Sequence, residues 1–205
     1  MIKIHSLKGE NSMSMRVNDV LVNWLELQKW DERPEVDEEN QSSSTHVKHK
    51  IGDGYTVNCF IRVEEKTGMI KFFWYFLDSK IPASKLEEVI KFVNLVNIEI
   101  GIGHFAVIPD DTGDPTYLRF YDAIYAWNAA IELQHISNLH DAGIGAMSSR
   151  LPQFMAICFG GKTAEEALEI EAARREEIIN AHSRELLYTG ITSSKKRLTL
   201  VVPSS

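Results

Sequence analysis

Residues 55–63 alternate between apolar and polar side chains, the pattern of a β-strand with one covered face and one wetter face. Glu65 to Gly68 follows with the composition of a turn. The next stretch, Met69 to Leu77, is almost continuously apolar and aromatic, which is typical of a central strand covered on both faces. Together these residues predict a hairpin.

Apolar residues at helical spacing predict a helix near the start of the chain, from about Val17 to Leu25, with Asn18 or Asp19 as its cap. The stretch from Asp31 to Lys50 then turns polar. It begins acidic, passes through serines and ends basic. A solvated loop is the prediction for it, and an acidic recognition arm is the alternative.

Ser84 and Glu87 match the S-x-x-E capping box and predict the start of a second helix. The apolar stripe of this helix continues to Ile100 and contains Asn97. A polar amide in an apolar stripe is costly to desolvate, so Asn97 must find a hydrogen-bond partner.

The second half of the chain predicts another hairpin, with strands at 104–108 and 116–120 and an aspartate-rich loop between them. A long helical zone is then expected from near Asp122, with Gly143 and Gly145 breaking it.

Thr163 and Glu166 form a second capping box, which starts a helix predicted to run to about Leu187. The order of elements is then helix, two strands, helix, two strands and further helices. Because hairpins join the strands, the sequence predicts an α+β fold, an antiparallel β-sheet with helices packed on it.

The 205 residues hold 29 acidic and 22 basic side chains, a net charge of −7, which argues against a broad basic surface for nucleic acid or direct DNA binding. Cys59 and Cys158 each lie in an apolar run, as buried free thiols of a reducing compartment do. Apolar runs are too short to span a bilayer, and residues 1–15 lack a signal-peptide core. The expectation is a cytoplasmic protein with no nucleic-acid or membrane partner.

The strongest formal motif is the segment Ala156 to Thr163, which fits the looser G/A-x-x-x-x-G-K-[ST] form of a phosphate-binding loop. Ala156 stands where the first glycine belongs, and no aspartate follows in a later apolar run to hold magnesium. A helix that ends at Gly160-Gly161, followed by a new helix capped by Thr163, explains the same sequence without a phosphate loop. Nucleotide binding is therefore kept as the alternative function.

Other polar groupings do not have the spacing of a catalytic or metal site. Glu132 and His135 give a single E-x-x-H, whereas di-iron bundles need two. His46 and His49 are placed in the polar loop, where they would hold a metal only adventitiously. The aspartates between 110 and 114 are expected to form a turn, because strands flank them and not helices. No cofactor and no metal are predicted.

Several motifs match a known family: Ile70 to Leu77, Ile81-Pro82, Val93 to Asn97, Gly103-His104-Phe105, Leu118-Arg119-Phe120 and Gly160 to Ala167. Over about residues 16 to 170 the chain resembles the YbjN family of bacterial proteins, sometimes described as sensory transduction regulators. The resemblance implies a fold like that of type III secretion chaperones and a protein-binding or regulatory role without enzyme activity. It divides the chain into an N-terminal segment (1–15), a YbjN-like α+β domain (16–172) and a charged helical extension and tail (173–205).

The sequence thus predicts a non-enzymatic, chaperone-like protein that binds a protein partner and can form a homodimer. An aromatic sheet face or a helix groove would present the binding surface. Its candidate residues are Phe72, Trp74, Phe76 and Trp127. Plain burial in the core is the competing interpretation of each ring.

Overall fold

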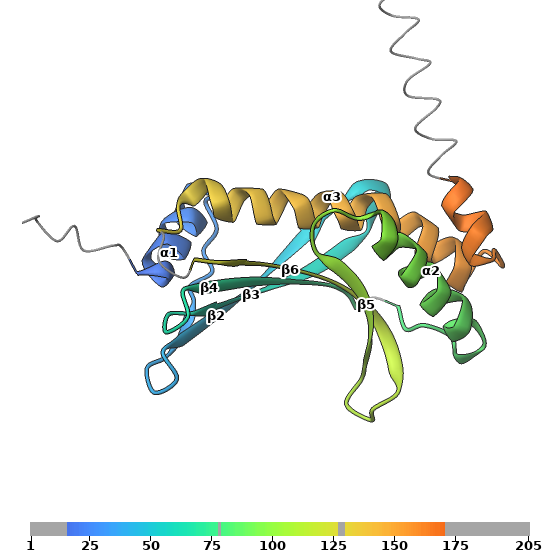
Figure 1. Ribbon diagram of the computed structural model, residues 1–205, viewed down its shortest axis with the longest axis horizontal. Coiled ribbons are helices and arrows are strands. Elements are labelled where there is room, and N and C mark those ends of the chain that lie inside the picture. The colour runs from blue at the N-terminus through green and yellow to red at the C-terminus, as the bar shows by residue number, and fades with distance from the viewer. Residues whose placement is uncertain (1–15, 78, 127–129, 171–205) are drawn as a thin grey trace, which may run out of the picture.

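The computed structural model describes residues 16–77, 79–126 and 130–170 (Figure 1). Its elements, in chain order, are α1 (Val17–Leu27), β1 (Glu35–Asp37), β2 (Ser42–Lys50), the 3-10 turn η1 (Gly52–Gly54), β3 (Thr56–Glu64), β4 (Met69–Phe76), the 3-10 turn η2 (Ala83–Lys85), α2 (Leu86–Glu99), β5 (His104–Pro109), β6 (Pro115–Tyr125) and α3 (Leu133–Cys158). A further helix begins at residue 164 and reaches the end of the described range at 170.

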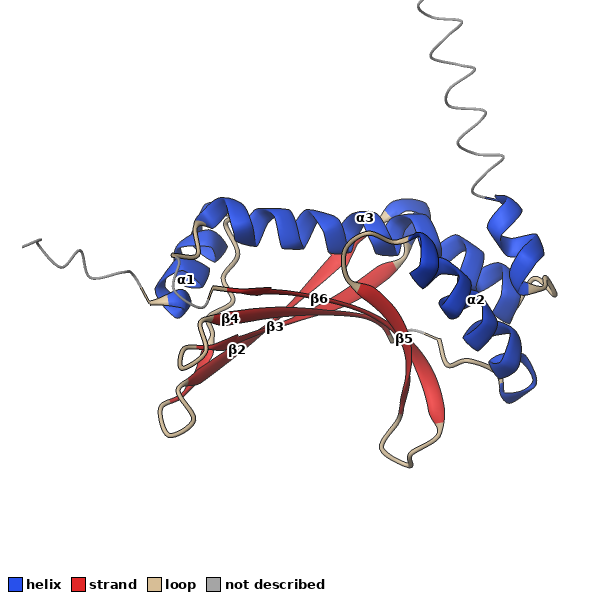
Figure 2. Ribbon diagram, viewed as in Figure 1, coloured by secondary structure: helices blue, strands red, loops and turns tan. Residues whose placement is uncertain are grey.

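The strands form one six-stranded sheet in the order β1-β2-β3-β4-β6-β5, with every neighbouring pair antiparallel. The helices lie on one side of this sheet, with α3 running along it, and the sheet curves away from them (Figure 2). The predicted α+β fold, an antiparallel sheet with helices packed on it, is confirmed. We call the side of the sheet that faces away from the helices the open face.

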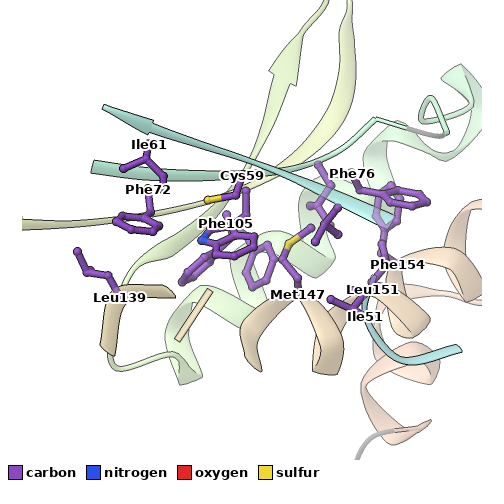
Figure 3. Packing of buried hydrophobic residues seen from close by; sticks show 14 of the residues in the cluster. Ile51, Cys59, Ile61, Phe72, Phe76, Phe105, Leu139, Met147, Leu151 and Phe154 are labelled. Carbon is purple, nitrogen blue, oxygen red and sulfur yellow. The ribbon is translucent and has the colours of Figure 1, made fainter. Parts of the chain in front are cut away.

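One hydrophobic core fills the space between the sheet and the helices. Alternate residues of β3 and β4 supply its sheet side, and α3 supplies much of its helix side (Figure 3). The side chains of Trp24, Phe72, Trp74 and Phe154 are at most 1% exposed. Burial of such large rings is a main favourable term in folding.

The polar stretch predicted as a loop is largely a pair of strands. β1 and β2 pair antiparallel, and β2 pairs along its whole length with β3. The loop prediction is wrong because β2 has few apolar residues, yet its alternate residues Ser43, Thr45 and Val47 are buried. A strand with one solvent face needs only every second side chain to be covered.

The helical zone predicted from Asp122 is also wrong at both ends. β6 continues to Tyr125, and α3 then runs unbroken through Gly143, Gly145 and Pro152. Gly143 lies against the indole of Trp74, where an added Cβ would come within 1.9 Å of Nε1. The glycine therefore serves close packing of α3 on β4 and does not end the helix.

Neither of the side-chain caps predicted for α1 and α2 forms. The carboxylate of Glu65 accepts hydrogen bonds from the backbone N–H groups of Val17 (3.1 Å) and Asn18 (2.6 Å), at the start of α1. Neither Asn18 nor Asp19 caps α1, so that prediction is wrong. Ser84 does not cap α2 either, because it lies inside η2 and α2 begins two residues later, at Leu86, without a side-chain cap.

Two other sequence expectations are confirmed. The Asn97 amide hydrogen-bonds the backbone of Phe105 twice, donating to its carbonyl at 2.9 Å and accepting from its N–H at 2.8 Å. The second capping box forms as predicted. The Glu166 N–H donates to Thr163 Oγ1 at 3.2 Å, and the Thr163 N–H donates to the Glu166 carboxylate at 3.0 Å. The later part of this helix, towards Leu187, lies outside the described residues.

Candidate functional site on the open face of the sheet

A row of aromatic side chains crosses the open face from strand to strand. His46 of β2 pairs with Phe60 of β3, Phe60 with Phe73 of β4, Phe73 with Tyr121 of β6, and Tyr121 with His104 of β5. We call these five residues the aromatic row. Residues at paired positions point to the same side of a sheet, so the five rings form one line across five strands.

The rings of the row touch one another and the residues beside them. The imidazole of His46 stacks on Phe60 with centroids 4.3 Å apart, and the rings of Phe73 and Tyr121 are 5.1 Å apart. Arg119 lies beside the row, its guanidinium carbon 5.7 Å from the centroid of Phe73. Such contacts hold the rings in place, and Phe60 still leaves 39% of its surface exposed. The row is an aromatic surface on the open face, partly exposed to solvent.

Two hollows flank Phe60 on the open face. One, of about 400 Å³, lies towards the edge strand β1 and is lined by Glu32, Arg33, Glu35, Ser44, Thr45, His46 and Phe60. The other, of about 300 Å³, lies towards the β5–β6 turn and is lined by Phe60, Tyr75, Leu77, Ile108, Pro109, Asp110, Asp111 and Tyr117. The first is mostly polar in its side chains, and the second combines aromatic and apolar walls with two carboxylates.

The partner-binding residues predicted from the sequence lie elsewhere. Phe72 and Trp74 are fully buried and Phe76 is 2% exposed, all beneath the helices, so the surface predicted from them is wrong. Trp127 lies outside the described residues. β4 also has only one fully covered face, and its odd-numbered residues Phe73 and Tyr75 are half-buried.

The sequence did not identify the aromatic rings of the open face, because of the composition of β4. Both faces of this strand carry aromatic residues, so hydrophobicity alone does not tell the covered face from the open one. One signal was available. Phe60 stands between Cys59 and Ile61, at a position of the β3 alternation that otherwise carries Asn58 and Arg62. Because Phe60 alternates with these polar residues, the sequence places its ring on the wetter face of the strand.

The phosphate-loop-like segment has the wrong surroundings for a phosphate loop. Ala156 to Cys158 form the last turn of α3, and the Lys162 N–H donates to the carbonyl of Ala156 at 3.1 Å. A helix therefore precedes the glycines, whereas a phosphate loop follows a strand of a parallel sheet. Every strand pair of the described sheet is antiparallel.

The remaining sequence candidates have structural roles. Glu132 and His135 form a capping box at the start of α3, in which the Glu132 N–H donates to His135 Nδ1 at 3.0 Å. The aspartate-rich loop is a hairpin turn, as predicted, closed by a bond of 2.9 Å from the Asp110 N–H to the Asp114 carbonyl. Within the described ranges, no group of three or more His, Cys, Asp or Glu side chains is placed to hold a metal ion.

Both cysteines are free and buried. Burial raises the pKa of the Cys158 thiol to about 12 and raises that of Cys59 well above its usual range. A thiol with a raised pKa is a poor nucleophile at neutral pH.

A histidine pair that the sequence did not predict joins β2 to α3. The Nε2 atoms of His49 and His140 are 3.3 Å apart, and Asp141 accepts from His140 Nδ1 at 3.1 Å. The rings of Trp30 and Trp74 lie 4.9 Å and 5.3 Å from the His49 ring. Desolvation and the neighbouring His140 lower the pKa of His49 to about 4, so His49 is neutral at pH 7, and burial lowers the pKa of His140 as well. The loop position predicted for His46 and His49 is wrong, since both lie in β2.

No protein-family model matches the chain, and no curated protein matches it significantly. In the part of the chain that the structure describes, none of the helices combines the length and the apolar character needed to traverse a bilayer.

Proposed function

We propose that this chain is a non-enzymatic, chaperone-like protein that holds an apolar segment of a partner protein on the open face of its sheet. The aromatic row is the observation that supports the proposal. The five rings are in register on the open face, and the described helices lie on the other side of the sheet (Figure 2). Contiguous exposed apolar surface of this kind is characteristic of interaction sites.

The edges of the sheet favour binding on its face over the addition of a partner strand. At the β5 edge, Asn97 occupies the outward N–H and carbonyl of Phe105. At the other edge, β1 has only three residues, all exposed, and two of them are the acids Glu35 and Asp37. Short, charged or side-chain-covered edges resist pairing with another chain. A partner segment is therefore expected to lie across the strands, with its apolar side chains on the rings.

The proposal includes the wider features expected from the sequence. These are a cytoplasmic location, a homodimer, and a regulatory role of the kind implied by the resemblance to the YbjN family. The antiparallel sheet with helices on one side supports the resemblance at the level of fold class only.

The test is a fluorescence anisotropy titration with a labelled, uncharged peptide of about twelve residues that carries Leu or Phe at alternate positions. A peptide with Ser at those positions is the control ligand. We expect saturable binding of the apolar peptide to the wild-type protein and loss of most of that binding in Phe60→Ser. The matched control variant is Ile90→Ser, because Ile90 is 43% exposed on α2, away from the open face. Equal binding by wild type and Phe60→Ser, or no binding by wild type, would contradict the proposal.

A further inference from the structure

The hollow beside the β5–β6 turn combines groups that together attract a cation. Its walls are the rings of Phe60, Tyr75 and Tyr117, and its rim carries the carboxylates of Asp110 and Asp111. Aromatic faces attract ammonium and guanidinium groups, and carboxylates pair with them. The hollow measures about 300 Å³, which is enough for a long side chain.

The protein's own Lys80 shows that these groups accept an ammonium. Its Nζ donates to Asp110 Oδ2 at 3.0 Å and lies 5.8 Å from the centroid of the Tyr117 ring. Hydrogen bonds from Thr112 and Lys80 hold the pKa of Asp110 well below its usual range, so its carboxylate stays ionised. The Lys80 side chain is 62% exposed, so it lies at the margin of the hollow and leaves the interior accessible.

One of the two carboxylates at the hollow has no cation paired with it among the described residues. Asp110 is paired with Lys80, whereas Asp111 is exposed and makes no ion pair with the other described residues. The hollow on the other side of Phe60 also carries two acids and one base, Glu32, Glu35 and Arg33, but it lacks tyrosine rings. The two ends of the open face therefore differ in the aromatic surface beside the carboxylates, and the chain as a whole carries a net charge of −7.

We propose that the hollow at the β5–β6 turn is a subsite for a Lys or Arg side chain of the partner protein's segment. The apolar residues flanking that side chain lie on Phe60 and Tyr75, and its charge lies against Asp111 and the Tyr117 ring. This inference rests on the proposed function. It specifies the composition of the bound segment, which is apolar with one basic residue.

The test compares two labelled peptides that differ at one position. Both carry the apolar pattern of the uncharged peptide, and the variable position is Lys in one and norleucine in the other. In low salt, we expect the Lys peptide to bind the wild-type protein about three- to tenfold more tightly, as an exposed ion pair and a cation–π contact together provide. The preference should shrink in about 0.5 M salt, where exposed charges are screened.

Two variants test whether the preference for the Lys peptide arises at this hollow. Asp111→Asn removes one charge at nearly constant shape and should abolish most of the preference for Lys, chiefly by weakening binding of the Lys peptide. Glu39→Gln removes another exposed acid, in the β1–β2 turn, and should leave the preference intact. A preference that survives Asp111→Asn, or that Glu39→Gln removes equally, overturns the subsite.

The outcomes separate this inference from the proposed function. Equal binding of both peptides to wild type overturns the cation subsite and leaves the binding face standing. Failure of both peptides to bind overturns both proposals. The other possible occupant of the open face is a second copy of this chain, and sedimentation of the protein without peptide tests for it. If wild type is a dimer and Phe60→Ser is a monomer, a second copy occupies the face. That result would also overturn the subsite.

Discussion

Phe72 and Phe73 are consecutive residues of β4, and they lie on opposite faces of the sheet. Phe72 is fully buried between the sheet and the helices, next to Trp24 with ring centroids 6.2 Å apart. Phe73 belongs to the aromatic row of the open face, 5.1 Å from Tyr121. Two identical side chains thus have different roles because successive residues of a strand point to opposite sides.

Replacing each phenylalanine by alanine should separate stability from binding. Phe72→Ala leaves a cavity in the core and should lower the free energy of unfolding by about 3–5 kcal/mol. Phe73→Ala removes a half-buried ring and should cost about 1–2 kcal/mol, less than Phe72→Ala, while weakening binding of the apolar peptide. Urea unfolding and anisotropy titration measure the two effects. Similar losses of stability in both variants would contradict the assignment of faces.

The two glycines inside α3 should respond oppositely to alanine. An added Cβ at Gly143 would overlap the indole of Trp74, so Gly143→Ala should destabilise the protein by about 1–3 kcal/mol. An added Cβ at Gly145 meets nothing within 4 Å, so Gly145→Ala should stabilise the helix by about 0.5–1 kcal/mol. Thermal unfolding of the pair tests this. A stabilising Gly143→Ala would show that α3 does not lie against Trp74.

The His49–His140 pair should make the protein acid-sensitive. The pKa of His49 in the folded protein is about 4, below its ordinary value of 6.5, so the unfolded chain binds more protons between these values. Stability should therefore fall as the pH drops from about 6.5 towards 4. The imidazole is only half-buried, so after allowing for solvent screening we expect a contribution of about 1–2 kcal/mol.

Urea unfolding at several pH values, with wild type and His49→Gln, measures this contribution. The variant should lose less stability than wild type over the same acid range, because one titrating group is gone. His135→Gln is a suitable control, since His135 is exposed at the start of α3 and a glutamine there can still accept the capping hydrogen bond from the Glu132 N–H. Parallel pH profiles for wild type and His49→Gln would refute the assignment.

Asn97 should protect the β5 edge as well as stabilise the fold. Asn97→Ala leaves the N–H and carbonyl of Phe105 without their side-chain partner and should cost about 1–3 kcal/mol. The freed edge should also promote association between copies of the chain. Unfolding and light scattering at increasing concentration measure the two effects. Asn94→Ala, at an exposed position of the same helix, should produce neither.

The segment Ala156 to Thr163 should not bind nucleotide. A helix precedes its glycines, and the Lys162 N–H is hydrogen-bonded to the Ala156 carbonyl. Calorimetric titration of ATP with magnesium into wild type and Lys162→Ala should therefore give no binding heat in either protein. Saturable heat in wild type that Lys162→Ala removes would restore the alternative function.

Elements whose signals are local could be predicted from the sequence. The β3–β4 and β5–β6 hairpins follow from alternation and turn residues, and the cap at Thr163 follows from side chains three residues apart. The need of Asn97 for a partner also followed from the sequence, because an amide in an apolar stripe cannot stay unpaired. These interactions involve near neighbours or one residue's own chemistry.

Features that depend on distant residues could not be predicted and became visible in the folded chain. β2 is a strand because β3 lies beside it, and α3 runs through Gly143 because the ring of Trp74 fills the space of the missing side chain. The aromatic row arises from the register of five strands, which no single stretch of sequence encodes. The helices cover one face of the sheet, and that choice buries Phe72 and leaves Phe73 on the face that we propose as the binding surface.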